Sequence, residues 1–330
     1  MTRLTHLALG AVLLLGLGVP ASSAATPDKL LPAETDTVVS INLRQIIDSD
    51  VIKKYALEQI KQAIEGQEAK ALLNDLGLDP LKDIDRMVVA TIDTSRENTK
   101  FLLIVHGSFD PDKLFKTAEA QSKKDSDRFA MVRDGNIVMF KYQPETGDPP
   151  LYGTVVNDNT VIAASEKKLI ADALAAEKNG PAKLKPELTA LLKKMDDKAS
   201  MYAVSLVKGK FDDVQVPGGG NLPIDLSGIQ KVLPSAETIA MTLKISVDVN
   251  LEVTFGMKDD EAATDMQNTV EELLKQLKPL AALAGAADER AKPLADILAT
   301  VKTTAKNKDV IISGKIAGAA IAQMIRGGGE

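Results

Sequence analysis

The chain has 330 residues, 40 basic and 46 acidic side chains, a formal net charge of −6, and neither cysteine nor tryptophan. Without cysteine it has no thiol catalysis, zinc–thiolate site or iron–sulfur cluster. The acidic balance, with no long basic run, argues against a nucleic-acid partner, because phosphate backbones attract clustered Lys and Arg.

The first 25 residues have the pattern of a secretory signal peptide. Arg3 precedes an apolar run from Leu7 to Val19, and the small residues of "PASSAAT" follow. The apolar run is shorter than the about 20 residues that a permanent membrane anchor needs. Cleavage after Ala24 and after Ala25 fit the pattern equally well. We expect an exported protein, periplasmic or extracellular, without a permanent anchor and without a cysteine to accept a lipid.

The first half predicts strands and helices that follow one another closely. "DTVVSINLRQII" reads as a strand leading into a long amphipathic helical stretch, from Ile46 to near Gly77. Strands are predicted over 83–93 and 100–107, and Asp110 with Pro111 reads as the N-cap and first residue of a helix. Asp134-Gly135 and Asp158-Asn159 predict two hairpins, which force antiparallel neighbours.

The second half repeats this order. "SMYAVSLVKGKF", "SAETIAMTLKIS", "NLEVTFGMKDDEAA" and "KDVIISGKIAGAA" each match a segment of the first half. In place of the hairpins we expect helices over about 261–278 and 288–306, separated by Pro279, with "KTTAKNKD" as the cationic end of the second. The repeat predicts an α+β fold made of two diverged copies of an antiparallel-sheet unit with helices packed on one face.

The corresponding boundaries divide the chain into five parts. Residues 1–25 are the signal peptide, 26–180 the first unit, 181–198 a linker helix, 199–326 the second unit and 327–330 a flexible tail. Whether the two units share one sheet is left open by the sequence.

His106 is the only histidine that remains after the signal peptide. Aligning Gly107 with Gly256 without a gap places His106 opposite Phe255, on the apolar face of the second copy. We therefore expect His106 to be a core ring that phenylalanine would replace without harm. The alternative is a hydrolase in which Ser108 and His106 act together, since Ser, His and Asp can form a nucleophilic triad. Asp110, the nearby carboxylate, already has a predicted role as a helix cap.

Other chemical signals are weak. The "G-x-S-x-G" and "H-E-x-x-H" motifs are absent, and one histidine cannot form a multi-histidine metal site. Asp212 and Asp213 resemble solvated surface carboxylates, although such pairs can bind calcium or act in acid–base chemistry. "PGGGN" at 217–221 reads as a flexible linker in a long loop. We predict no catalytic, cofactor-binding or metal-binding residue.

The apolar pattern of the strand at 100–107 indicates that both of its faces are covered. The same alignment places Leu103 and Val105 opposite Glu252 and Thr254, so the first-copy strand is apolar on both faces. Large exposed apolar patches are uncommon on soluble monomers. The second face is therefore covered by another part of the chain, or by a protein partner or an apolar ligand.

The segments "LLPAETDTVVSINLRQIIDSDVIKKY", "FDPDKL" and "NTVIAASEKKLIADAL" resemble an uncharacterised family of exported bacterial proteins, a domain of unknown function. The resemblance implies an exported α+β protein and supplies no catalytic residues. The leading hypothesis is a non-enzymatic binding or scaffolding protein of the bacterial envelope. The alternatives are a hydrolase that uses Ser108 and His106 or carboxylates, and a carrier of an apolar ligand.

Overall fold

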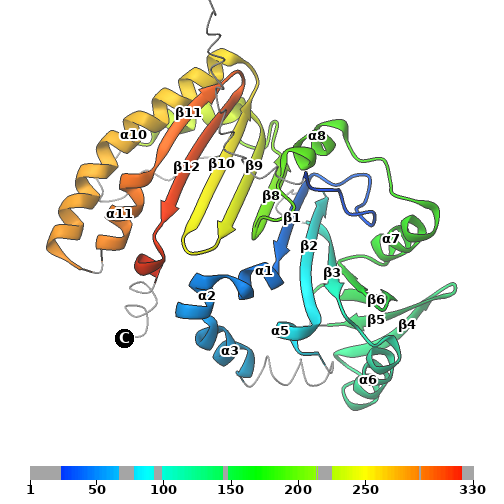
Figure 1. Ribbon diagram of the computed structural model, residues 1–330. Helices are drawn as coiled ribbons and strands as arrows, with labels where there is room; N and C mark the ends of the chain where they lie inside the picture. The colour runs from blue at the N-terminus through cyan, green and yellow to red at the C-terminus, as the bar shows by residue number, and fades with distance from the viewer. Residues whose placement is uncertain are drawn as a thin grey trace, which may run out of the picture.

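A computed structural model describes residues 24–66, 78–92, 99–143, 148–212, 214, 225–289 and 291–321. These residues form one sheet of twelve strands, with helices along both faces (Figure 1). Every pair of neighbouring strands is antiparallel. The predicted α+β class and the antiparallel sheet are therefore confirmed.

The strands follow the segments that alternate in hydrophobicity. In chain order they are β1 (Thr37–Asn42), β2 (Ile84–Ile92), β3 (Lys100–Gly107), β4 (Phe129–Asp134), β5 (Ile137–Tyr142), β6 (Leu151–Asn157), β7 (Thr160–Ala164), β8 (Met201–Leu206), β9 (Ala236–Ile245), β10 (Val249–Met257), β11 (Lys302–Lys306) and β12 (Asp309–Ile316).

The two halves share this sheet and meet where β1 pairs with β8. Outward from this pair, the first half runs β1-β2-β3-β7-β6-β5-β4 and the second runs β8-β9-β10-β12-β11. In each half, the third strand is followed by the strand of a later hairpin. This common order is the one expected of two related units, and their common origin stays a prediction.

The helices are shorter in the first half than the sequence pattern predicts. They are α1 (Leu43–Asp48), α2 (Asp50–Tyr55), α3 (Leu57–Glu65), α5 (Pro80–Asp83), α6 (Pro111–Lys124), α7 (Lys167–Asn179), α8 (Pro186–Lys194), α9 (Ser227–Val232), α10 (Asp260–Ala287) and α11 (Lys292–Thr300).

Local side-chain bonds explain where two of these helices begin and end. The expected continuous helix from Ile46 is interrupted at Ser49, which is extended and whose hydroxyl donates to the Ile46 carbonyl at 2.6 Å. This bond ends α1, because Ser competes with the helical backbone bonds. The predicted cap of α6 is confirmed, since the Asp110 carboxylate accepts from the Lys113 N–H at 3.0 Å.

The expected helix boundaries near the C-terminus are wrong. Helix α10 continues through Pro279 to Ala287, and "KTTAK" is strand β11 instead of the end of a helix. The residues of β11 alternate between exposed and half-buried, and they pair with β12. The period-2 pattern of this segment and the free edge of β12 thus outweigh its cationic composition.

The sheet has two faces, which we name after the long helices that cover them. On the α8 face, Val38, Val88, Ile104, Ile162 and Val204 are buried beneath α7 and α8. On the α10 face, α10 packs in the second half of the sheet against a separate cluster that includes Ile239, Phe255 and Val310. The first half is therefore covered mainly on one face and the second half mainly on the other.

Gly107, at the end of β3, is held by a close backbone approach. A Cβ atom at this position would lie 1.9 Å from the Asp83 carbonyl oxygen, which also accepts from the Ser108 N–H at 2.8 Å. A side chain here would push β3 away from the end of α5. Glycine is therefore required at this junction for steric reasons.

We predict that Gly107→Ala lowers the free energy of unfolding by about 2–3 kcal/mol, since overpacking against fixed backbone costs this much. Urea unfolding measures the change. Gly314→Ala is the matched control, because a Cβ there would lie 3.4 Å from Val301 Cγ2, an ordinary contact. Equal losses in the two variants would contradict the steric explanation.

Candidate functional site

His106 lies on the α8 face, opposite to the face of Phe255. In β3 it pairs with Arg86, which pairs in turn with Asn42 of β1. Ser40, two residues before Asn42, points to the same face. Cross-strand pairing from Ser40 places three further residues on this face: Tyr202 of β8, Thr242 of β9 and Glu252 of β10. Because side chains alternate along β10, Glu252 and Phe255 point to opposite faces.

The expected equivalence of His106 and Phe255 is therefore wrong by one residue. When Thr37, the first residue of β1, is matched with Met201, the first residue of β8, the cross-strand pairing of each half makes His106 equivalent to Gly256. The register is irregular next to both positions, between Ile84 and Arg86 and between Gly256 and Met257. A slip of one residue exchanges the two faces of a strand, so a gapless comparison of the sequences gives the wrong face.

His106 connects the sheet to the segment that precedes β1. Its Nε2 lies 2.5 Å from Asp28 Oδ2, and its Nδ1 lies 3.3 Å from the Thr160 hydroxyl. The Asp28 side chain is only 7% exposed, whereas the His106 side chain is 32% exposed. Leu30 and Leu31, which follow Asp28, are both buried in the core. The imidazole thus fastens the N-terminal segment to β3.

Asp28 belongs to no motif that would mark it in the sequence as a site residue. A carboxylate just before the apolar pair Leu30 and Leu31 was the available signal, because a chain that buries both leucines also draws Asp28 out of solvent. Burial raises the pKa of Asp28, but the hydrogen bonds from His106 and the Leu30 N–H, with the charges of His106 and Arg86, bring it below its ordinary value.

Arg86 extends this polar cluster across the α8 face. Its guanidinium donates to Ser40 Oγ at 2.9 Å, Asp197 Oδ1 at 3.0 Å and the Tyr202 hydroxyl at 3.2 Å. Burial raises the pKa of Tyr202. Each of these groups is hydrogen-bonded, as buried polar groups must be to avoid a desolvation penalty. The cluster therefore has the character of a structural network.

The geometry gives little support to the hydrolase alternative. Ser108 is exposed, and the hydrogen bonds of His106 go to Asp28 and Thr160. Thr160 is only 6% exposed, which leaves little access for a substrate. Asp110 caps α6, and Asp212 is exposed, while Asp213 and residues 217–221 lie outside the described residues. Within the described ranges, no group of three or more potential ligands could hold a metal ion.

The α10 face carries a broad apolar surface in the middle of the sheet. It spans six neighbouring strands, β7, β3, β2, β1, β8 and β9. Cross-strand pairing aligns its side chains in two rows. We call this surface the central patch, and define it as Val39, Ile41, Met87, Val89, Leu103, Val105, Val161, Ala163, Met201, Ala203 and Met241.

All residues of the central patch are half-buried, and none belongs to a hydrophobic cluster of the described residues. By contrast, their neighbours on the α8 face, such as Leu102 and Ile104, are fully buried. β3 is thus apolar on both faces, as predicted, and only one of these faces is packed beneath described helices. Among the described residues, the centre of the sheet is the part of the α10 face that lacks a packed cover.

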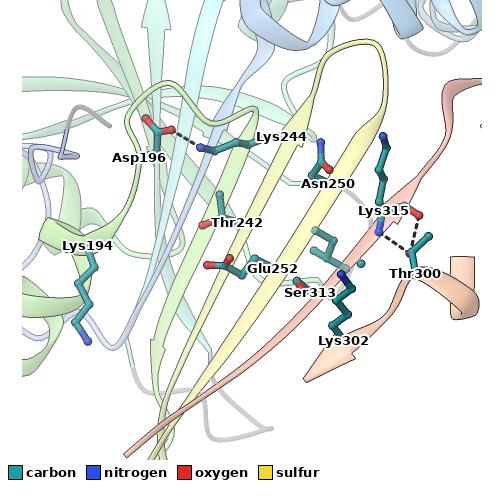
Figure 2. A pocket seen from close by; sticks show the side chains of 12 residues that line it. Lys194, Asp196, Thr242, Lys244, Asn250, Glu252, Thr300, Lys302, Ser313 and Lys315 are labelled. Atoms are coloured by element: carbon teal, nitrogen blue, oxygen red, sulfur yellow. Dashed lines mark hydrogen bonds and ion pairs between the residues drawn. The ribbon is translucent and has the colours of Figure 1, made fainter. Parts of the chain in front are cut away.

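The opposite face is polar in the second half. Here the sheet forms the floor of a groove lined mainly by lysine, carboxylate, amide and hydroxyl side chains (Figure 2). An apolar and a polar surface thus lie on opposite faces of one sheet. In the described part of the chain, no helix has the length and apolar character needed to cross a bilayer.

Comparison with models of protein families and with curated proteins gives no match. Among solved structures, crystal form I of TP0453 is similar, with a TM-score of 0.47 and 10% sequence identity over 93% of this chain and 98% of that chain. A similarity of this size carries no argument about function.

We predict that His106→Phe lowers the free energy of unfolding by about 2 kcal/mol, because it leaves the buried Asp28 carboxylate without its partner. The double variant Asp28→Leu with His106→Phe should recover most of this loss. Chemical denaturation of the single variants and the double variant measures the coupling. Additive losses would show that the two side chains do not depend on each other.

We also predict that the pair stabilises the protein less in acid. The pKa of Asp28 is lower in the folded chain, so its stabilising contribution is complete above the unfolded value, near 3.8, and disappears as the pH falls through the folded value. The stability difference between the native protein and Asp28→Asn should shrink below about pH 4. Asp127→Asn, at an exposed position, is the control for the loss of one carboxylate from the surface.

Proposed function

We propose that this is a non-enzymatic binding protein of the bacterial envelope, and that the central patch is its binding surface. The observation that supports the proposal is a contiguous apolar surface on six strands, none of whose residues belongs to a hydrophobic cluster of the described part of the chain. Apolar surfaces of this extent on soluble proteins usually mark interaction sites. The pattern of the first 25 residues supports export.

The shape of the surroundings favours a helical protein partner. On the α10 face, α10 covers one end of the sheet, and Phe115 of α6 packs against Phe140 of β5 near the other end, with ring centroids 5.2 Å apart. Between these ends lie six strands, a width of about 24 Å at a spacing of about 4.8 Å. Helices pack 8–10 Å apart, so the gap accommodates about two helices. An amphipathic helix pair would complete the interrupted layer.

The composition of the patch keeps an apolar ligand as a second candidate. Met87, Met201 and Met241 lie on three of its strands. Methionine is flexible and polarizable, and it is frequent at surfaces that adapt to varied apolar partners. A surface without hydrogen-bonding side chains would also accept an acyl chain.

We predict that a photo-crosslinking amino acid at position 103 gives a specific adduct with another protein in the native envelope. The same group at Thr304, an exposed position on the α8 face of β11, should give none. Leu103→Lys, combined with crosslinking from Val39, should abolish the adduct, because a buried ammonium is costly at an apolar interface.

Mass spectrometry of the adducts separates the candidates. A partner protein supports the proposal, and an adduct with lipid favours the ligand carrier. An adduct with a second copy of the chain, or no adduct from positions 39, 103 and 201, would overturn the proposed partner. Unfolding measurements on Leu103→Lys check that the loss of binding does not come from loss of the fold.

A further inference from the structure

The groove on the α8 face has the size of a ligand site. Strands β9, β10 and β12 form its floor (Figure 2). One wall is the end of α8 with the residues after it, and the other is the junction of α11 with β11. Its volume is about 700 Å³, within the usual range for small-molecule sites. In the first half, α7 and α8 fill the same face of the sheet, whereas no described helix covers it here.

Three lysines at the perimeter of the groove are paired with aspartates. Each ammonium lies within ion-pairing distance of one carboxylate, although all three lysine side chains are more than half exposed, so these pairs only bias where the charges lie. Such a bias reduces the entropy that binding costs. The pairs are Lys194 with Asp309 at 3.1 Å, Lys244 with Asp196 at 2.7 Å and Lys315 with Asp248 at 2.6 Å.

The floor of the groove carries polar side chains, three of them exposed to solvent, that have no protein partner among the described residues. Cross-strand pairing places Glu252 beside Ser313, and Ser313 beside Lys302 of β11. Asn250 lies two residues before Glu252, on the same face. Among the described residues, the side chains of these four make no hydrogen bond or ion pair. Glu252 is left free although lysines lie nearby, because Lys244 and Lys315 are paired with Asp196 and Asp248.

We propose that this groove binds a small anionic molecule that carries hydroxyl groups, of which an acidic sugar is the simplest class. The Lys302 ammonium and the Ser313 hydroxyl, on adjacent strands, would receive the anionic group. The Glu252 carboxylate would accept from ligand hydroxyls, and the Asn250 amide would both donate to them and accept from them. The Glu252 carboxylate would repel a ligand with several negative charges along the floor. The part of the ligand beside Glu252 must therefore carry hydrogen-bond donors.

The test is an NMR titration of the full chain with glucuronate, glucose and acetate. We expect glucuronate to shift the amide signals of β10, β11 and β12, with glucose and acetate binding more weakly. Lys302→Ala should weaken glucuronate binding by about tenfold, as expected for a hydrogen bond to a charged group. Lys306→Ala, on the same strand and outside the groove, is the matched control and should leave the affinity unchanged.

Glu252→Ala tests the hydroxyl part of the proposal. It should weaken the binding of glucuronate, because it removes an acceptor for the ligand hydroxyls. It should leave the binding of acetate unchanged or make it tighter, because it removes a negative charge from the floor. Three results would overturn the proposal: no glucuronate-dependent shifts, equal affinity of Lys302→Ala and the native chain, or acetate binding as tightly as glucuronate. Each is independent of the central patch, which lies on the other face of the sheet.

Discussion

The register of one continuous antiparallel sheet determines how every surface of this protein is composed. Because β1 pairs with β8, both halves contribute side chains to the same two faces, and the alternation along each strand decides which face each residue joins. The core beneath α8, the central patch and the polar groove all follow from this alternation. A shift of one residue at β1 or β8 would move the groove lysines to the face of the central patch.

The two halves use this shared sheet differently. The first half buries its α8 face beneath α7, α8 and the N-terminal segment, and the second buries its α10 face beneath α10. In the described part of the chain, each half therefore has one face without a packed helical layer over much of it, and these two faces differ in chemistry. The first half keeps valine, leucine and methionine on this face, whereas the second has Lys244, Glu252 and Lys302. An apolar surface costs free energy in water when it is left uncovered, and a polar one does not, so a macromolecular partner is expected on the first.

Local signals predicted much of this fold. The hairpin of β4 and β5 turns at Gly135, which has a φ of 56°, and the Asp110 cap is formed as expected. Both depend on residues within a few positions of one another. The contact of Asp28 with His106 joins residues 78 positions apart, and no local pattern encodes it. The path of α10 through Pro279 and the pairing of β11 likewise depend on tertiary contacts that outweigh local preference.

There is a further physical reason why comparing the sequences of the two halves could not predict the face of the sheet on which His106 lies. At the position that corresponds to it in register, Gly256, a Cβ atom would lie 2.2 Å from the Thr238 hydroxyl, so the second half has no room there for a side chain. The two glycines that were aligned are therefore required for different reasons. Gly107 leaves room for the Asp83 carbonyl, whereas Gly256 leaves room for the side chain of Thr238 on the neighbouring strand. Without a side chain at 256, the second half has no counterpart of the contact through which His106 fastens Asp28 and the buried leucines over the first half. The glycine that misaligned the two halves thus also leaves the second half without the side chain that would anchor such a cover.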